Sequence, residues 1–260
     1  LLSQKSRRRE QFHSLERVVS GGEPLPRSVA DGYEERFGVR INEGYGLTET
    51  SPATNICMPD DWKRGSVGPP LKDLEVRIVG ENEQVLGPHE EGEIRFRGPN
   101  IMKGYYHLPE ETAAVFDADG FFRTGDMGKV DEDGHVYITG RIKEMLIVGG
   151  ENVFPREIEE VLNAHPAVHA SAVVGMHDDL RGELPLAFIA LEEDAACSET
   201  DLRSWCRERL AAYKVPREIR RLSELPRNPT GKILRRQLTG QTPGEPWPAA
   251  APTPAGGGEA

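Results

Sequence analysis

Two glycine-rich stretches of the chain carry oxygen groups suited to binding a nucleotide. GYGLTET (44–50) follows an apolar run and presents Thr48 and Glu49. A threonine hydroxyl donates to phosphate oxygens, and a carboxylate oxygen is a ligand that Mg²⁺ prefers. FFRTGDMG (121–128) offers Asp126 in a predicted Thr-Gly-Asp turn, where a carboxylate can accept from the two hydroxyls of a ribose. These residue types predict nucleotide chemistry, although each stretch alone is also typical of an ordinary turn.

Two further stretches place basic residues beside glycines. GRIKEMLIVGG (140–150) supplies Arg141, Lys143, Gly149 and Gly150. A pair of glycines lets another molecule approach the backbone closely. ELPRNPTGKILRRQL (224–238) sets Lys232 on a turn behind two prolines, just before an expected helix start. The simplest interpretation is a solvated lysine between a strand and a helix, because Gly and Pro mark turns in most chains.

In their order and spacing, these stretches resemble the acyl-adenylate-forming superfamily of acyl-CoA synthetases, peptide-synthetase adenylation domains and luciferase-like enzymes. The resemblance is greatest to medium- and long-chain fatty-acid–CoA ligases and extends from residue 15 to residue 240. It is carried by GYGLTET, GEIRFRGPNIMKGYYHLPEETAAVFDADGFFRTGDMG, GRIKEMLIVGGENVFPREIEEVL and LAAYKVPREIRRLSELPRNPTGKILRRQL.

The resemblance implies a role for each residue of these motifs. Gly21, Gly22 and Glu23 would line an adenine pocket, with Tyr45 and Gly46 between the adenine and the acyl group. Thr48 would contact the α-phosphate, Glu49 would bind Mg²⁺, Asp126 would hold the ribose hydroxyls, and Arg141 would contact ribose or phosphate. Lys143 would be the hinge, Gly149 and Gly150 would border the channel for CoA, and Lys232 would be catalytic together with Glu49 and Thr48.

The implied reaction has two steps and uses ATP, Mg²⁺ and CoA. A fatty-acid carboxylate and ATP give acyl-AMP and pyrophosphate, and the CoA thiol then displaces AMP. Lys232 would bridge the two anions in the first step, where a positive charge placed in advance lowers the barrier. The C-terminal domain would then turn about Lys143, which removes Lys232 and brings in the two glycines, so the domain acts as a conformational gate.

The elements that must position these residues begin with short strands and a helix. Residues 15–22 predict a strand, residues 28–38 a helix closed by Gly38, and residues 39–50 a strand that enters the first glycine-rich loop. The segments 74–80, 92–98 and 134–141 alternate apolar and charged residues. That alternation predicts antiparallel strands with one face in solvent.

The pattern changes after Arg141 to a β-α-β-β-α-β order, with helices at 155–166 and 198–210 and a last strand near 217–222. We therefore expect a fold that combines α/β and α+β parts. Residues 1–141 would form the end of a large adenylate-forming N-terminal domain with a small antiparallel β subdomain. Residues 142–240 would form a compact α+β C-terminal domain, and residues 241–260 a disordered Pro/Ala/Gly tail.

The resemblance implies a fatty acid, ATP and CoA as partners, and composition excludes several other classes. The net charge of −11 and the pI of about 5.2 argue against a general nucleic-acid binder. No stretch reaches the roughly 18 apolar residues of a transmembrane segment. The three scattered cysteines include no CxxC pair, which predicts a reducing, cytoplasmic setting.

One feature of the family is not found in the sequence: the Ser/Thr/Gly-rich phosphate loop that precedes these motifs. The chain therefore resembles the rear portion of such an enzyme, with an N-terminal half supplied by a longer gene product or a separate subunit. Two alternatives stay open. The chain would be an adenylation domain that loads the phosphopantetheine of a carrier protein, or a catalytically inactive binding module.

Overall fold

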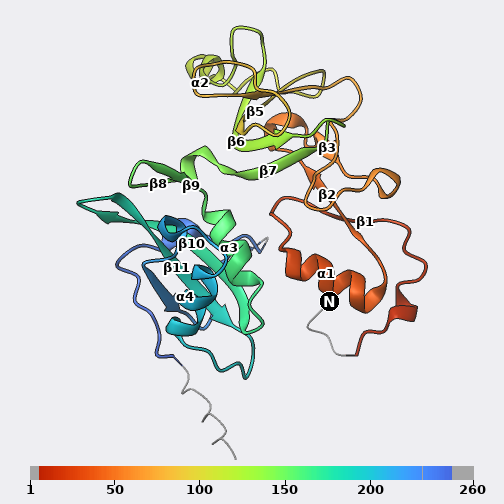
Figure 1. The fold of residues 1–260 in the computed structure, drawn as a ribbon. Helices are drawn as coiled ribbons and strands as arrows, with labels where there is room; N and C mark the ends of the chain where they lie inside the picture. The colour runs from red at the N-terminus through yellow and green to blue at the C-terminus, as the bar shows by residue number, and fades with distance from the viewer. Residues whose placement is uncertain (1–5, 230, 248–260) are drawn as a thin grey trace, which may run out of the picture. The chain divides into compact units, whose positions relative to one another are not determined.

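Two compact units make up the chain, Leu1–Glu144 and Met145–Ala260. The computed structural model describes residues 6–229 and 231–247, and Figure 1 follows the chain through both units. The fold is α+β with mixed sheets and short helices, as the sequence predicted. Residues 142–144, which the sequence assigned to the second domain, belong to the first unit. Within the described ranges, every helix is too short or too polar to cross a membrane.

A small mixed sheet opens the first unit. β1 (Val18–Ser20) and β2 (Ile41–Tyr45) pair in parallel, and β3 (Asn55–Ile56) pairs antiparallel to β2. The crossover between β1 and β2 is α1 (Arg27–Phe37), which ends where Gly38 adopts a left-handed φ of 67°. Strand, helix and strand confirm the sequence prediction. Because β1 and β2 are parallel neighbours, the loops that follow them lie at the same sheet edge.

The second sheet of the first unit is antiparallel, in the order β4-β5-β6-β7. Its strands are β4 (Glu75–Val79), β5 (Gly92–Arg97), β6 (Phe122–Val130) and β7 (Val136–Arg141), and α2 (Pro109–Ala114) lies between β5 and β6 in the chain. One face packs on Ile78, Ile94, Phe96 and Val136, all buried. The short 3-10 turns of this unit are Arg9–Gln11 (η1), Thr48–Thr50 (η2), Pro59–Asp61 (η3) and Ile142–Glu144 (η4).

The predicted Thr-Gly-Asp turn is wrong, because these residues lie inside β6. The register between β5 and β6 is broken there. Glu93 opposes Met127 and Arg95 opposes Arg123, so residues 124–126 face a single residue of β5, Ile94. Extra residues in one strand form a bulge that re-aims the local side chains. The chain therefore bends at Asp126 without reversing its direction. A glycine is typical of a bulge of this kind as well as of a turn, so the sequence alone does not distinguish the two.

The second unit is built on one sheet in the order β10-β11-β8-β9, with β12 also paired to β11. Its elements are β8 (Leu146–Val148), β9 (Glu151–Val153), α3 (Pro155–Asn163), β10 (Val168–Asp178), β11 (Gly182–Leu191), α4 (Glu199–Arg207) and β12 (Glu218–Arg221). The two helices and four strands that the sequence predicted before the Lys232 turn are present, and the short strand β9 is added between β8 and α3. α4 begins at a capping box, in which the Asp201 N–H donates to Ser198 Oγ at 3.2 Å.

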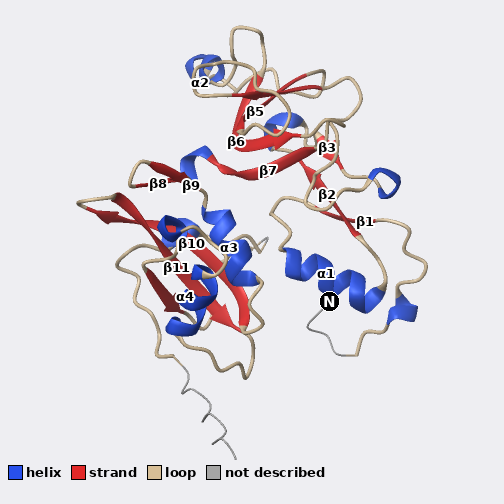
Figure 2. Cartoon of the chain, in the orientation of Figure 1, coloured by secondary structure: helices blue, strands red, loops and turns tan. Residues whose placement is uncertain are grey.

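Both faces of this sheet are covered. Alternate residues of β11 point to opposite faces. Ala187 and Ile189 pack with Ile158 of α3 and Leu202 of α4. Leu186 and Phe188 pack on the other side with Leu225, Ile233 and Leu238 from the C-terminal segment. Figure 2 shows the two helices beside β10 and β11. The segment that carries Lys232 is therefore part of the packed unit.

The C-terminal segment differs from the prediction in two ways. The helix expected after Lys232 is only a 3-10 turn, η6 (Arg235–Gln237). The disordered tail expected from residue 241 is wrong for its first part, because Glu245 pairs with Arg221 and Trp247 packs on the core of the second unit. Hydrogen bonds from the guanidinium groups of Arg220 and Arg221, together with the packing of Trp247, fix the position of this stretch. The remainder of the predicted tail, residues 248–260, lies outside the described residues.

Candidate functional site

The loop after β1 and the end of β2 meet at one sheet edge. Ser20 opposes Glu43 in the parallel ladder, so Gly21 follows directly beside Gly44. A Cβ on Gly21 would lie 3.0 Å from the Gly44 carbonyl oxygen, which shows how closely the two backbones approach. Ligands of α/β sheets bind at the carboxyl ends of parallel strands. The structure therefore brings the predicted adenine loop, Gly21 to Glu23, next to the end of β2 that carries Tyr45.

Gly46 begins a tightly folded loop that presents Thr48 and Glu49. A Cβ at Gly46 would lie 1.8 Å from the Pro52 carbonyl oxygen, so no other residue fits without moving the backbone. Leu47 N–H donates to Thr50 Oγ1 at 2.8 Å, and the Asn100 side chain donates to the carbonyls of residues 50 and 53, each at 2.8 Å. Asn100 was not predicted as a site residue. Its amide holds the loop from a segment 50 residues away in the chain.

Glu49 is half-buried and has a tyrosine partner. Tyr105 donates its hydroxyl to Glu49 Oε1 at 3.0 Å, and Met102 N–H donates to the Glu49 carbonyl at 2.8 Å. Burial raises the pKa of Tyr105, and the Glu49 carboxylate raises it further. No sequence pattern distinguishes Tyr105 from its neighbour Tyr106, which is 86% exposed. The structure assigns the contact to Tyr105.

The surroundings of Glu49 fit the predicted Mg²⁺ role only if the nucleotide supplies other ligands. Among the described residues, no three His, Cys, Asp or Glu side chains gather as a metal site. Mg²⁺ often binds through one or two carboxylates together with substrate phosphates and water. Glu49 offers one hard oxygen group, and the exposed Thr48 lies beside it in the chain. The donor set suits a metal that arrives with a triphosphate.

Asp126 is the centre of a buried polar cluster in the first unit. Its side chain is only 4% exposed, and both carboxylate oxygens have partners. Tyr45 donates to Oδ2 at 2.5 Å, and Arg141 Nε lies 3.0 Å from Oδ1. Burial, followed by the Asp126 charge, holds the pKa of Tyr45 far above its ordinary value. Arg141 stands opposite Asp126 in the β6–β7 ladder. Tyr45 and Arg141, two of the predicted site residues, are therefore each in direct contact with a third, Asp126.

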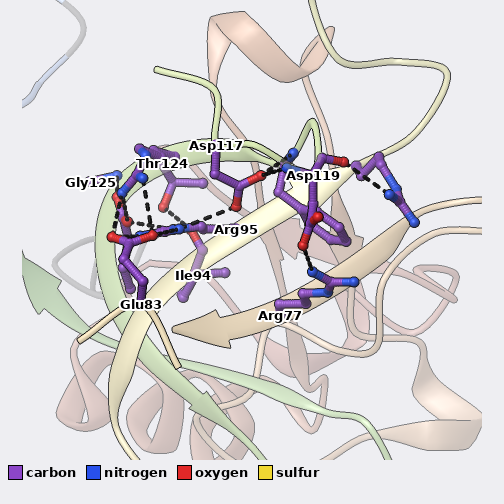
Figure 3. A network of polar contacts seen from close by, with 12 residues as sticks. Arg77, Glu83, Ile94, Arg95, Asp117, Asp119, Thr124 and Gly125 are labelled. Atoms are coloured by element: carbon purple, nitrogen blue, oxygen red, sulfur yellow. Dashed lines mark hydrogen bonds and ion pairs between the residues drawn. The ribbon is translucent and has the colours of Figure 1, made fainter. Parts of the chain in front are cut away.

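The bulge in β6 is held by hydrogen bonds to the neighbouring strand β5 and by one within β6. Thr124 donates its hydroxyl to the Ile94 carbonyl at 2.6 Å and accepts from Asp126 N–H at 3.0 Å. Gly125 has a left-handed φ of 69°, and its N–H donates to Glu93 Oε1 at 3.2 Å. Figure 3 shows Thr124 and Gly125 at one end of this network. The backbone that presents Asp126 is thus held by β5 and by the Thr124 side chain.

Arg95 is the buried cation of the same network. It contacts Glu93 at 2.7 Å, Glu83 at 2.6 Å and Asp117 at 3.2 Å, while only 4% of its side chain is exposed (Figure 3). Hydrogen bonds from Arg95 and Arg123 lower the pKa of Glu83 to about 2. The alternation in GEIRFRG predicted that the charged residues of this strand face solvent. That prediction is wrong for Arg95, which is buried. Burial is possible because three carboxylates compensate its charge.

Replacing Arg95 with methionine should destabilise the first unit by about 3–5 kcal/mol, because it leaves partly buried carboxylates without their cation. The measurement is the free energy of unfolding from a urea titration of the chain. Arg97→Met is the matched control on the same strand. Arg97 pairs with Glu75 at the surface, where ion pairs contribute about 0–1 kcal/mol. Equal losses in the two variants would contradict a special role for Arg95.

The same network predicts a pH dependence. Glu83 has a folded-state pKa of about 2, below its ordinary value of 4.5. Stability from this lowered pKa is present above the unfolded-state value and is lost as the pH falls toward 2. Between about pH 2 and pH 4.5, the free energy of unfolding should therefore change less with pH for Arg95→Met than for the original chain.

The second unit carries Gly149, Gly150 and Lys232. The two glycines form the turn between β8 and β9, with φ values of 61° and 91°, the backbone of a type I′ hairpin turn. A Cβ at either position would meet nothing within 4 Å, so the backbone is open to another molecule. The structure thus shows a tight two-glycine turn with open space beside both residues, and their role beside a ligand stays a prediction.

Lys232 lies at the end of a closed turn. Asn228 N–H donates to the Lys232 carbonyl, and Lys232 N–H donates to Asn228 Oδ1, both at 2.8 Å. Gly231 has a φ of 92°, which favours glycine. Two hydrogen bonds with Asn228 therefore hold the backbone at Lys232. Lys143, the predicted hinge, is exposed in η4, at the end of the first unit.

Comparisons with known proteins agree with these features. The model of the AMP-binding enzyme family matches residues 1–106, and that of the AMP-binding enzyme C-terminal domain matches residues 157–232. The chain is 43% identical over 223 residues to a 2-succinylbenzoate–CoA ligase of Geobacillus kaustophilus, which covers 85% of this chain and 45% of the relative. It is 43% identical over 229 residues to a long-chain-fatty-acid–CoA ligase of Bacillus subtilis, covering 86% and 40%.

A solved structure shares the fold. ATP-bound MatB from Rhodopseudomonas palustris aligns with a TM-score of 0.86 at 35% identity, over 92% of this chain and 48% of that one. The chain spans less than half of the length of each of these three proteins. The two matched family models together cover more than half of this chain, in the order expected from the motifs. The chain belongs to the acyl-adenylate-forming superfamily of AMP-binding enzymes.

Proposed function

We propose that this chain forms the C-terminal part of an ATP-dependent acid–thiol ligase that works through an acyl-AMP intermediate. The observation that carries the proposal is the contact of Tyr45 and Arg141 with the buried Asp126, beside the loop that follows β1. The two CoA ligases at 43% identity support the reaction class. In the first step a carboxylate oxygen bonds to the α-phosphorus and pyrophosphate leaves. In the second, the CoA sulfur bonds to the acyl carbon, AMP leaves, and the thiol proton passes to solvent.

Asp126 would bind the ribose of the nucleotide. Each carboxylate oxygen accepts more than one hydrogen bond, so Asp126 can accept from ribose hydroxyls while Tyr45 keeps its place. Arg141, whose side chain is 48% exposed, would move from Asp126 toward the ribose or the phosphates. Gly21, Gly22 and Glu23 would line the adenine, and Thr48 would donate to the α-phosphate. Mg²⁺ at Glu49 would neutralise charge on the triphosphate.

The two glycines and the lysine of the second unit would act in different steps. Lys232 would place its ammonium between the carboxylate and the α-phosphate while acyl-AMP forms. Gly149 and Gly150, whose backbone is open, would border the arm of CoA when the thiol attacks. Rotation at Lys143 would exchange one for the other, so that the same active site serves both steps.

A fatty acid is our first candidate for the acid substrate. One of the two relatives named above acts on long-chain fatty acids and the other on 2-succinylbenzoate, and both are CoA ligases by name. The acceptor would therefore be CoA. A carrier-protein phosphopantetheine has the same thiol chemistry and is the alternative acceptor. An inactive binding module would retain the contacts of Asp126 but form no acyl-AMP.

The proposal is tested with a ligase in which this chain replaces the matched part of the Bacillus subtilis relative, called the test ligase below. We expect it to release pyrophosphate with a fatty acid and ATP, and to form acyl-CoA when CoA is added. Asp126→Ala should reduce kcat/KM for ATP by roughly 10–100-fold, because a hydrogen bond to a charged group contributes about 1.5–3 kcal/mol. Asp133→Ala, an exposed carboxylate that pairs with Lys63, is the control and should change little.

Three outcomes separate the alternatives. A folded test ligase without pyrophosphate release, beside an active parent, would contradict the adenylating function and favour the inactive module. Pyrophosphate release without acyl-CoA would favour another acceptor. A preference for 2-succinylbenzoate over a series of fatty acids would overturn the substrate and leave the reaction class in place.

A further inference from the structure

A buried ion pair in the second unit joins α3 to the segment that carries Lys232. Arg235 in η6 contacts the carboxylate of Glu159 through two nitrogens, with Nη2 at 2.7 Å from Oε2 and Nε at 3.2 Å from Oε1. The Glu159 side chain is 9% exposed and that of Arg235 is 21% exposed. A two-pronged arginine–carboxylate contact fixes direction as well as distance. η6 therefore has a defined position against α3.

Glu159 also binds the backbone of the sheet edge. Val173 N–H donates to Glu159 Oε1 at 2.8 Å. Among the described strands β10 lies at the edge of its sheet, so Glu159 takes the place of a strand partner for this N–H. One carboxylate thus connects α3, the edge strand β10 and η6. Because its charge is largely buried, Glu159 needs the cation that Arg235 provides.

The turn at Lys232 is held between two anchors. On its N-terminal side Leu225 is buried in the apolar cluster on the sheet, and Ile233, directly after Lys232, packs on the same cluster. On its C-terminal side Arg235 is only three residues from Lys232, a step that spans roughly 10 Å at most. Leu234 N–H also donates to the Pro226 carbonyl at 2.8 Å, which closes the base of the turn. The position of Arg235 therefore limits where Lys232 can lie on the unit.

We propose that Glu159 and Arg235 are positioning residues for Lys232, and that their ion pair serves the adenylation step in particular. This inference rests on the proposed function, in which Lys232 acts only while acyl-AMP forms. Neither residue needs to touch a substrate. If the ion pair only stabilised the fold, its loss would weaken both half-reactions alike, because both need a folded second unit. A positioning role predicts that the two half-reactions separate.

The test compares Glu159→Gln with Glu157→Gln in the test ligase. Glutamine at 159 still accepts from Val173 N–H but weakens the pair with Arg235. Glu157 lies two residues earlier on α3 and pairs with Lys214 at 2.6 Å, away from the Lys232 turn, so it is the matched control. Acyl-AMP formation is followed by pyrophosphate release without CoA. Thioester formation is followed separately from supplied acyl-AMP and CoA.

We expect Glu159→Gln to reduce acyl-AMP formation roughly 10–100-fold, the loss that corresponds to one charged hydrogen bond. Thioester formation and Glu157→Gln should stay close to the unmodified ligase. Arg235→Lys, which keeps the charge but not the two-pronged contact, should fall between. Equal loss in both half-reactions, or no loss in either, would overturn the inference.

Two controls keep the result interpretable. If Glu159→Gln does not fold by circular dichroism, the double variant Glu159→Gln, Arg235→Gln replaces it, since it leaves no unpaired buried charge. The double variant should show the same separation of the half-reactions. Lys232→Ala is assayed in parallel. If Lys232→Ala leaves acyl-AMP formation intact, the proposed function fails. If Lys232→Ala is impaired and the Glu159 variants are not, only the positioning role fails.

Discussion

Replacing Lys232 with alanine should reduce acyl-AMP formation by the test ligase by about 10²–10³-fold, the usual loss when one pre-positioned stabilising group is removed. The carboxylate and the α-phosphate are both anionic, and their repulsion grows as they approach. A compact ammonium between them offsets that repulsion. The turn itself should survive the change, because Asn228 holds it through backbone atoms of residue 232.

The measurement for Lys232→Ala is the rate of each half-reaction. Thioester formation from supplied acyl-AMP should be nearly unchanged, because the lysine has no part in that step. Arg236→Ala removes a positive charge four residues further on, at an exposed position, and is the control. A loss shared by both half-reactions would show that Lys232 is structural, which is the simplest interpretation of its turn.

Replacing Lys143 with proline should impair one half-reaction by about a hundredfold and spare the other. Lys143 lies in the 3-10 turn η4 (Ile142–Glu144) at the end of the first unit. Proline fixes its own φ and disfavours a helical conformation at the residue before it, here Ile142. A proline in a helical turn costs about 3 kcal/mol, which corresponds to a hundredfold change in population. The half-reaction that requires the 3-10 conformation of η4 should therefore be the one that is impaired.

Lys143→Ala is the matched variant, because it removes the charge and keeps the freedom of the backbone. We expect it to affect both half-reactions mildly. The assay is again acyl-AMP formation and thioester formation run separately. If the proline variant carries out both at the rate of the unmodified ligase, no rotation at Lys143 is needed, and the hinge role is wrong. If proline and alanine act alike, the charge matters and the backbone does not.

The sequence predicted the elements well where hydrophobic periodicity and glycine or proline boundaries coincide. α1 ends at Gly38, and α4 begins at the Ser198 capping box, because each signal acts within a few residues. The β-α-β-β-α-β order predicted for the second unit followed from the same local rules, which missed only the short strand β9 before α3. Local signals failed at residues 124–126, where a glycine that marks a turn instead marks a bulge inside a long strand.

The candidate site was predictable only as a set of separate motifs. Tyr45 and Asp126 are 81 residues apart, and nothing in either motif states that one hydroxyl donates to the other carboxylate. Arg95 was expected in solvent because its strand alternates. It is buried because Glu83, Glu93 and Asp117 come from different segments to surround it. Contacts of this kind depend on the tertiary fold, so a pattern along one strand cannot reveal them.

The packing of Trp247 changes where the second unit can be shortened. Trp247 covers part of the apolar core, and Arg221 donates to the Pro246 carbonyl at 2.9 Å just before it. The Pro/Ala/Gly-rich composition after residue 240 suggests that the unit can be truncated there. Such a truncation would expose that apolar surface to water and leave Arg221 without this acceptor. A self-contained version of the unit, or a fusion joined behind it, should therefore keep every residue through Trp247.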